Sequence, residues 1–365
     1  QFVDYTQIEP DEQLFGVLVQ YPAANGEIRD YRDMVEKVHG AGALAGVGAD
    51  LMSLTLLTPP GEWGADIVFG SNQRFGLPMS YGGPHAGFFA VRDELKRNMP
   101  GRLIGVSVDA HGNQALRMAL QTREQHIKRE RATSNICTAQ ALLATMSGMY
   151  AQYHGPEGLK RIGRHIFSSA CTLAGELKKL GYTIRHEQFF DTIRVQAMAG
   201  VTADMIRMIA LKRGINLWYP CANCALISTD EVTTLREVND LIGIFAEAAG
   251  KKAEEVTSLC DCFCIDEKFH RKTAFMQERT FNSYHSETDM MRYIKMLERK
   301  DFSLANGMIP LGSCTMKLNP AASMFAMSWP EYGNIHPFVP AEQAAGYHKV
   351  MEELGETLKE ITGFD

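Results

Sequence analysis

The sequence lacks several features that would place a chain in a specialised class. It has no apolar run near the ~18 residues that a membrane-spanning helix needs. Residues 1–10 lack the basic and apolar regions of a signal peptide. The formal net charge is -6, so no excess of basic residues favours nucleic acid or an anionic lipid surface. We therefore expect no membrane partner and no nucleic-acid partner.

Cysteine is also scarce, with 8 residues in a chain of 365. This number is too small for a disulfide framework in so long a chain and favours a reducing compartment. Cys221 and Cys224, followed by Cys260, Cys262 and Cys264, have the short spacing of zinc ligands. The second group has single-residue gaps, and no paired histidines follow it. We therefore interpret these cysteines as unrelated reduced thiols and predict no metal site.

The first 110 residues alternate between short apolar runs and helical periodicity. Runs at 14–19, 44–47, 65–69 and 87–91 predict strands, and the apolar spacing at 30–39 predicts a helix. Strands that alternate with helices are typical of an α/β unit with a largely parallel sheet. The chain length is sufficient for two domains or slightly more.

Further along, the pattern is that of a smaller α+β unit. Helical periodicity runs from 136 to 153 and stops at His154-Gly155-Pro156, because the proline cannot continue the backbone hydrogen bonds of a helix. A second helix is expected at 157–180. The elements after it are a strand at 190–195, a helix at 203–212, strands at 215–218 and 225–227, and a helix at 233–249.

The last third of the sequence has fewer elements. Residues 251–281 show no sustained periodicity and are interpreted as a connector. Ser286 and Asp289 have capping-box spacing and predict a helix. A further helix at 341–361 has an apolar stripe of Tyr347, Val350, Met351, Leu354, Leu358 and Ile361. No sheet follows that helix, and the chain starts in a polar loop, so we expect sequence to be missing at both ends.

Three stretches carry chemistry. Residues 70–87 hold five glycines and two prolines between two predicted strands, which lets backbone approach a ligand closely; a simple tight connection is the alternative. Residues 123–131 hold seven ionisable side chains in nine positions, which favours a solvated helical face with ion pairs over a binding site. Residues 308–320 crowd side chains that can hold a carboxylate or phosphate: Ser313, Cys314, Thr315, Lys317 and Asn319.

Together these stretches allow a family to be suggested. Residues 69–89, 120–154, 284–304 and 308–320 resemble the P-protein of the glycine cleavage system, a pyridoxal-phosphate-dependent glycine decarboxylase, and the string Gly-Ser-Cys-Thr-Met-Lys-Leu-Asn is very specific to it. The resemblance implies two related halves. Each has the type I aminotransferase-like α/β fold of pyridoxal-phosphate-dependent transferases, with a mostly parallel sheet and a smaller α+β domain.

The resemblance also divides the chain. Residues 1–154 correspond to the later part of the large domain of the first half, with its connecting helix, and 155–250 to the small α+β domain. Residues 251–283 form a connector. Residues 284–365 open the second half, which bears the cofactor in this family.

One implication concerns the lysine that forms a Schiff base with the cofactor. In the register of the resemblance the lysine position is Gln73, and the aspartate that pairs with the pyridinium nitrogen falls on Val47. An amide has no nucleophilic amine, and valine cannot stabilise a protonated ring. We therefore expect no Schiff-base lysine in this chain and place the family's lysine beyond Asp365.

By resemblance, the complete enzyme decarboxylates glycine with pyridoxal phosphate and transfers the aminomethyl group to the lipoyl arm of the H-protein. The loop at 313–319 is expected to be catalytic and to face the cofactor and the glycine carboxylate. The cleft wall beside the cofactor is assigned to Tyr81, Gly82, Gly83 and His85. The lipoyl entrance is assigned to Arg123, His126 and Arg129.

Several alternatives remain open at this point. The expected partners are glycine, the lipoylated H-protein and the remainder of the P-protein, in a homodimer or a two-subunit assembly. Alternatively, the chain is a non-catalytic scaffold or assembly module that pairs with a separate cofactor-bearing chain. An ordinary type I aminotransferase or aldolase is disfavoured by Gln73 and by the string at 312–319. The family occurs in bacterial cytoplasm or the mitochondrial matrix, and we expect cytoplasm.

Overall fold

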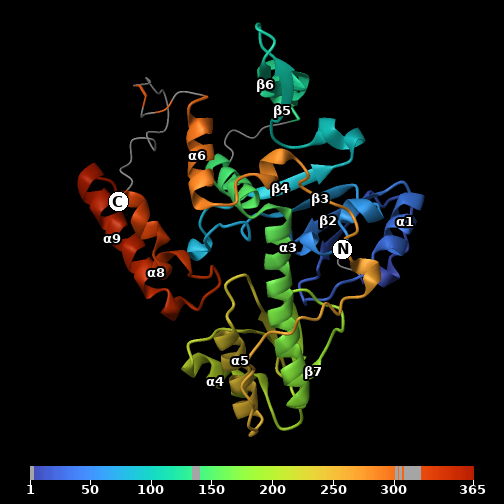
Figure 1. Ribbon diagram of the computed structural model, residues 1–365, viewed down its shortest axis with the longest axis vertical. Coiled ribbons are helices and arrows are strands. Elements are labelled where there is room, and N and C mark those ends of the chain that lie inside the picture. The colour runs from blue at the N-terminus through green and yellow to red at the C-terminus, as the bar shows by residue number, and fades with distance from the viewer. Residues whose placement is uncertain (1–3, 134–139, 301–302, 304–305, 308–321) are drawn as a thin grey trace.

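The computed structural model describes residues 4–133, 140–300, 303, 306–307 and 322–365 (Figure 1). It contains a large α/β domain, a small α+β domain and a C-terminal group of helices. The buried apolar side chains of the two domains form one continuous cluster, which includes Val47 of the large domain and Phe245 of the small one.

The large domain is built on a four-stranded sheet in the order β1-β2-β3-β4. Its strands are β1 (Gly16–Tyr21), β2 (Leu44–Ala49), β3 (Ile67–Ser71) and β4 (Gly87–Val91). The first three are parallel, and β4 is antiparallel to β3. The helix α1 (Arg32–Gly40) connects β1 to β2 and buries Met34, Val35 and Val38. The prediction of an α/β fold with a mostly parallel sheet is therefore confirmed.

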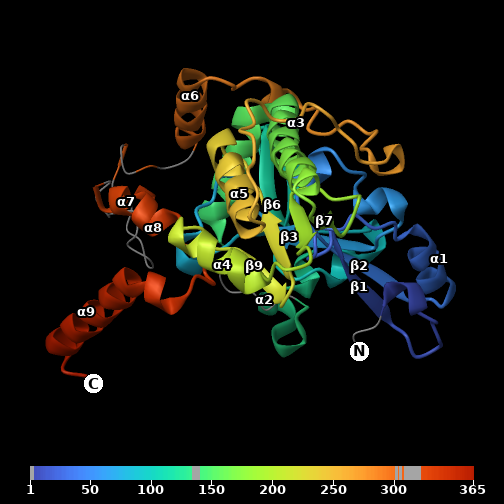
Figure 2. The ribbon, with the colours of Figure 1, turned by 90° about the horizontal axis from the view of Figure 1, so that it is seen from below.

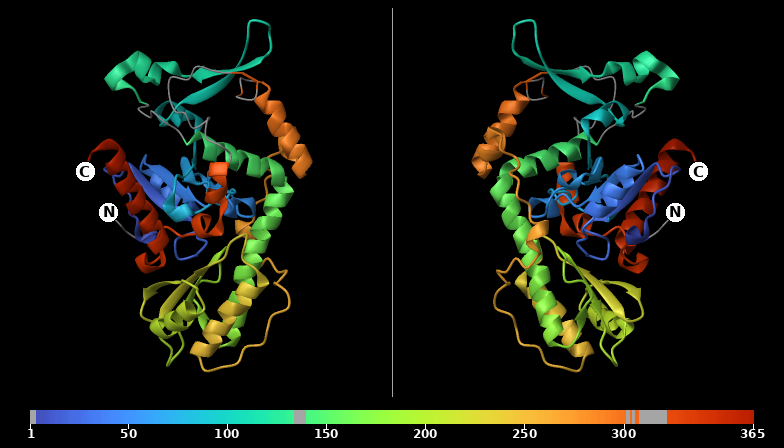
Figure 3. Two further views of the ribbon diagram at one scale, coloured as in Figure 1. Left: turned by 90° about the vertical axis from the view of Figure 1, so that its left-hand side faces the viewer. Right: turned by 90° about the vertical axis from the view of Figure 1, so that its right-hand side faces the viewer.

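A long helix, α3 (Ala141–Lys179), runs from beside the large sheet into the small domain (Figures 1 and 3). It is broken at Gly155, whose φ and ψ of 62° and 177° lie outside the helical region, and Pro156 follows. The predicted pair of helices therefore meets at the predicted break. The imidazole of His285 and the carbonyl oxygen of Phe281 pack so close to Gly155 that a Cβ atom there would lie within 2.8 Å of both.

The small domain has an antiparallel sheet in the order β7-β8-β10-β9, with helices packed beside it (Figure 2). Its strands are β7 (Thr183–Ile184), β8 (Thr192–Gln196), β9 (Trp218–Cys221) and β10 (Cys224–Ser228). Its helices are α4 (Ala203–Lys212) and α5 (Leu235–Ala248). Thr234 and Glu237 form a capping box at the start of α5, which satisfies backbone N–H groups there.

The first departure from the predictions is a hairpin formed by β5 (Leu103–Val108) and β6 (Gln114–Ala119). It projects from the body of the molecule (Figures 1 and 3). Ile104, Val106 and Val108 are between 62% and 72% exposed, so the apolar face of the hairpin is uncovered. The sequence suggested no strands here because its apolar residues are not those of a buried core.

The charged run at 123–131 also differs from a solvated helical face. It contains a helix of only four residues, α2 (Gln125–Lys128), between two short 3-10 turns. Arg123 and Glu124 are both about 4% exposed. The expectation of a solvated charged helix is wrong for these two residues, because the Arg123 guanidinium is bound to backbone carbonyl groups.

The C-terminal part is helical in the described residues. It contains α6 (Glu287–Glu298), α7 (Ala322–Phe325), α8 (Pro330–Gly333) and α9 (Ala345–Thr362). In α9 the predicted stripe is exposed from Val350 to Ile361, whereas Tyr347 is part-buried. No helix in the described part of the chain combines the length and the apolar character that crossing a membrane requires.

Short 3-10 turns complete the described secondary structure. They lie at Tyr5–Gln7, Ser53–Thr55, Pro60–Trp63, Ser80–Gly82, Asp93–Asn98, Gln121–Arg123, Arg129–Arg131, Glu267–Phe269, Arg279–Asn282, Ala326–Ser328 and Ala341–Gln343. Two of them, Glu267–Phe269 and Arg279–Asn282, are the only helical turns that the structure describes between 251 and 283. The two four-stranded sheets fall within 1–154 and 155–250, and the boundaries of these domains stay predictions.

The cysteines also differ from their prediction. Cys221 is bonded to Cys224, and Cys260 to Cys262, with Cα–Cα distances of 5.3 and 5.4 Å. These separations lie within the range that a disulfide spans. The interpretation of all these residues as unrelated reduced thiols is therefore wrong, although Cys264 is free.

We predict that residues 1–365 associate when purified alone. A large apolar side chain gains about 1.5–3 kcal/mol on full burial, and α9 and the β5–β6 hairpin both expose several such side chains. Size-exclusion chromatography with light scattering measures the mass, and Leu354→Glu with Leu358→Glu should reduce the association. A clean monomer of 40.6 kDa that melts cooperatively would contradict this expectation.

Candidate functional site

A pocket of about 640 Å³ opens at the carboxyl ends of the three parallel strands. Gln20 of β1, Ala49 of β2 and Phe69 of β3 line it, together with residues that follow each strand. Asp191 and Thr192 of the small domain also line it. Ligands of open α/β sheets bind at this edge, outside the carboxyl ends of the strands. We therefore take this pocket as the candidate site.

Two glycines allow backbone segments to pack closely around the pocket. Gly26 has a φ of 88°, and a Cβ atom there would lie 1.9 Å from the Thr192 carbonyl oxygen. A Cβ atom at Gly70 would lie 2.2 Å from the Ala49 carbonyl oxygen. A side chain at either position would force two backbones apart. The loop after β1 can therefore approach the small domain only with glycine at position 26.

Arg74 joins the two domains across the pocket. Its Nη1 donates to Asp50 Oδ2 at 3.1 Å, and its Nη2 donates to Asp191 Oδ2. Asp50 follows β2 in the large domain, whereas Asp191 precedes β8 in the small domain. The side chains of Arg74 and Asp50 are 26% exposed and that of Asp191 is 14% exposed. These three residues form what we call the Arg74 triad, and solvent screens it only in part.

The triad places two carboxylates against one guanidinium. Burial raises the pKa of Asp50 to about 6; Arg74 opposes this rise, and Asp191 adds to it. Burial lowers the pKa of Arg74, but the two carboxylates outweigh burial and raise it above its ordinary value. The guanidinium therefore stays charged, and Asp50 is the group that takes up a proton just below neutral pH.

Gln73 lies in the pocket lining, at the carboxyl edge of the sheet. Val47 is fully buried in β2 and is not among the lining residues. The described side chains that line the pocket include no lysine. The residues present therefore do not fit a cofactor that must be held covalently by an amine.

The glycine-rich loop lies against the C-terminal segment. The Tyr81 backbone N–H donates to the Ile335 carbonyl oxygen at 2.8 Å, and the rings of Tyr81 and Tyr347 are 4.9 Å apart. A Cβ atom at Gly82 would lie 3.1 Å from Pro337 Cβ. The predicted cleft-wall residues are absent from the lining of the described pocket: Tyr81, Gly82, Gly83 and His85.

The residues predicted at the lipoyl entrance have different surroundings. Arg123 is buried, and its guanidinium donates to the carbonyl oxygens of Met99 and Gly101, just before the β5–β6 hairpin. His126 and Arg129 are exposed. Arg123 thus anchors the base of the hairpin, while His126 and Arg129 are accessible to a partner. The predicted catalytic residues lie outside the described residues: Ser313, Cys314, Thr315, Lys317 and Asn319.

The sequence analysis missed the Arg74 triad. Two of its members could have been predicted from the sequence. Asp50 follows a predicted strand and Arg74 is adjacent to Gln73, which places both at the carboxyl edge of the sheet. Nothing in the sequence places Asp191, from the other domain, beside them. That contact depends on how the small domain packs.

We predict that Arg74→Ala lowers the free energy of unfolding by about 3 kcal/mol at pH 7, because it leaves two part-buried carboxylates unpaired. The loss should shrink at pH 5, because Asp50 is then largely protonated in the folded state and fewer charged carboxylates are left unpaired. The pKa of Asp50 is raised to about 6 in the fold, so its protonation favours the folded state. That contribution to stability is lost as the pH rises through about 6. Urea denaturation at both pH values measures the effect.

The matched control is Lys96→Ala, which removes an exposed ion pair with Asp93 and should cost less than about 1 kcal/mol. Equal costs for the two variants, or a cost at Arg74 that grows as the pH falls, would show that the triad does not hold the domains together.

Comparisons with known proteins agree with this architecture. The family model of the glycine cleavage system P-protein matches residues 2–245. The crystal structure of a glycine decarboxylase (P-protein) of the glycine cleavage system, in inhibitor-bound form, aligns with a TM-score of 0.61 and 35% sequence identity. The alignment covers 66% of this chain and 56% of that one.

Curated relatives match almost the whole chain. Glycine dehydrogenase (decarboxylating) of Bacteroides thetaiotaomicron is 54% identical over 360 residues, which cover 99% of this chain and 38% of that protein. The protein of the same name from Paraburkholderia xenovorans is 51% identical over 357 residues, 96% of this chain and 36% of that protein. The chain thus spans just over a third of the length of these relatives. It belongs to the P-protein family of the glycine cleavage system.

Proposed function

We propose that this chain is part of an enzyme that decarboxylates glycine and transfers the remaining aminomethyl group to the lipoyl arm of the H-protein. The observation that carries the proposal is the 54% identity to a glycine dehydrogenase (decarboxylating) over 99% of the chain. The alignment that gives this identity extends over both domains and the loops between them. Glycine, the lipoylated H-protein and the remainder of the P-protein are the partners that follow.

Within that enzyme, we propose that this chain forms the wall of the active-site cleft that the first half of the P-protein contributes. The pocket at the carboxyl edge of the sheet supports this role, since ligands of such sheets bind at this edge and the described lining contains Gln73 but no lysine. Pyridoxal phosphate supplies an electron sink for decarboxylation when it is bound. We propose that residues outside this chain hold it.

The glycine-rich loop supports a cleft at the junction of the two halves. Its Tyr81 is hydrogen-bonded to Ile335 and packs on Tyr347, both in the segment assigned to the second half. Tyr81, Gly82, Gly83 and His85 would then form the wall that faces the second half. We propose that the 313–319 loop, which continues the same segment, contacts the cofactor and the glycine carboxylate.

A lipoyl entrance beside the β5–β6 hairpin is the corresponding proposal for the H-protein. Exposed His126 and Arg129 can contact an incoming protein, while buried Arg123 keeps the hairpin base in place. The bacterial origin of the relatives supports a cytoplasmic location. The pocket without an amine also supports the second candidate, a non-catalytic assembly module, for any form in which the chain occurs alone.

Glycine-dependent exchange of labelled bicarbonate into the carboxyl group of glycine tests the activity. The assay contains pyridoxal phosphate and lipoylated H-protein. We expect no exchange with residues 1–365 alone or with the cofactor-bearing remainder alone, and exchange when both are present in one polypeptide. Exchange that also appears when the two parts are mixed would favour the assembly module. Full exchange by the remainder alone would rule out a role for this chain.

A second prediction concerns the cofactor. We expect that residues 1–365 do not bind pyridoxal phosphate covalently, because an amide at position 73 cannot form an imine with the aldehyde. Borohydride reduction with added cofactor, followed by peptide mass spectrometry, should give no stoichiometric pyridoxyl-lysine, while the full-length protein provides the positive control. A stoichiometric adduct would overturn the assignment, and Lys317 would be the first residue to inspect.

A further inference from the structure

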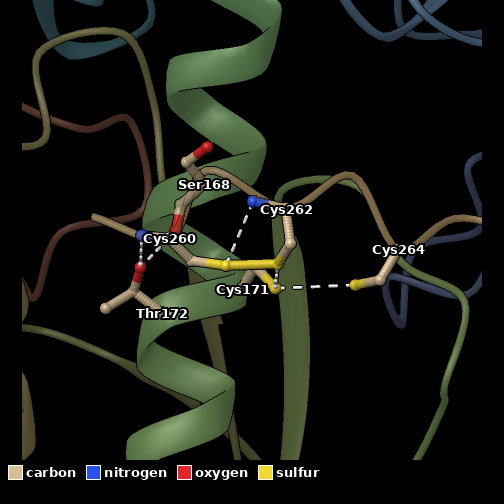
Figure 4. The surroundings of a disulfide bond; sticks show 6 residues. All are labelled: Ser168, Cys171, Thr172, Cys260, Cys262 and Cys264. Carbon is tan, nitrogen blue, oxygen red and sulfur yellow. Dashed lines mark hydrogen bonds between the residues drawn. A yellow bond between two sulfur atoms is a disulfide. The ribbon is translucent and has the colours of Figure 1, made fainter.

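Four cysteine sulfurs gather where the connector crosses α3 (Figure 4). Cys171 projects from α3, and Cys260, Cys262 and Cys264 lie on the connector. The Cys171 Sγ is 3.4 Å from the Cys262 Sγ and 3.6 Å from the Cys264 Sγ. The sulfurs of Cys171, Cys260 and Cys262 all lie within 4.8 Å of one another. The cluster therefore joins segments about ninety residues apart in the sequence.

These separations match the edges of a tetrahedral metal site. With a zinc–sulfur bond of ~2.3 Å, adjacent sulfurs of a tetrahedron lie about 3.8 Å apart. Both distances from Cys171 are close to that value. Cys260 and Cys262 are bonded to each other, so this pair must separate for four sulfurs to surround one ion. Cys264 lies close to Cys171 but outside the group of three sulfurs, so it must also move toward Cys260 and Cys262.

The backbone around the cluster already holds its sulfurs in place. The Cys260 N–H donates to Thr172 Oγ1 at 2.8 Å, which attaches the connector to the residue next to Cys171. The Cys262 N–H donates to the Cys260 Sγ at 3.2 Å. Hydrogen bonds of this kind orient metal ligands and stabilise their negative charge. Cys262 and Cys264 are exposed, so an ion can reach the cluster from solvent.

We propose that Cys171, Cys260, Cys262 and Cys264 form a tetrathiolate site for a soft divalent ion such as Zn²⁺ once the Cys260–Cys262 disulfide is reduced. A phosphine reductant donates two electrons to the disulfide and takes an oxygen atom from water, which leaves two thiols and a phosphine oxide. Zn²⁺ then binds four thiolates, and four protons leave to solvent. The site closes only in the reduced protein, so metal binding is under redox control.

This set differs from the zinc ligands that sequence spacing suggested. Cys221 and Cys224 are bonded to each other and do not belong to the sulfur cluster in the described residues. The fourth ligand is Cys171 of α3, which precedes Cys264 by 93 residues in the sequence. A bound ion would attach the connector to α3 on the C-terminal side of the break at Gly155.

Cobalt titration tests the proposal with residues 1–365 and with the full-length protein. Each is reduced with a phosphine, freed of metal and kept without oxygen. We expect one Co²⁺ per chain, with the intense visible bands of a tetrahedral tetrathiolate, and displacement of Co²⁺ by one Zn²⁺. Before reduction no such bands should appear. Zn²⁺ should also raise the melting temperature of the reduced protein, because the ion binds the folded state.

Variants separate this site from the other thiols. Cys264→Ser, at an exposed position, should weaken Co²⁺ binding roughly a hundredfold or more without unfolding the chain, and Cys171→Ser should do the same. Cys221→Ser is the matched control and should leave binding unchanged.

Three outcomes would overturn the proposal: no Co²⁺ uptake after reduction, unchanged uptake in Cys264→Ser, or loss of uptake in Cys221→Ser. A Cys171–Cys262 disulfide found by peptide mapping, without metal uptake, would instead identify a thiol–disulfide exchange site.

Discussion

The ionic contact of Arg74 with Asp50 and Asp191 is the constraint on which the candidate site depends. Each carboxylate belongs to a different domain, so the guanidinium fixes the small domain over the carboxyl edge of the large sheet. The close approach at Gly26 complements it, because a side chain there would push the loop after β1 away from Thr192. Asp50, Arg74 and Asp191 all belong to the lining of the pocket.

The pocket is built from a few structural features of the fold. Parallel strands, glycines at the tight contacts and a neighbouring domain are sufficient to build a cavity at the sheet edge. Gln73 is one of the residues that line this cavity, and the described lining contains no lysine. The contacts of Tyr81 with Ile335 and Tyr347 direct the glycine-rich loop toward the segment that follows. The architecture thus supports a structural role beside a cleft that other residues complete.

The long helix α3 links the remaining parts of the molecule. Phe281 of the connector and His285, which follows it, pack against the break at Gly155. Farther along the helix, Cys171 and Thr172 contact the connector at Cys262 and Cys260. The connector has almost no regular secondary structure of its own among the described residues. Its path is therefore set by contacts with other elements, which include α3, Asn239 of α5 and the backbone of Leu56.

The sequence by itself determined the local structure. Apolar runs located β1 to β4, the Gly155-Pro156 pair located the break in α3, and the apolar spacing at 203–212 reproduced α4. These features depend on backbone chemistry and on periodicity within a few residues. The β5–β6 hairpin was not predicted from the sequence, because its apolar residues are exposed and do not follow the pattern of a strand in a buried core. Only the tertiary structure decided that Arg123 is buried, that Asp191 meets Arg74, and that Cys171 joins the connector cysteines. Each of these contacts pairs residues from separate elements, and their proximity arises from packing between those elements, which local patterns do not encode.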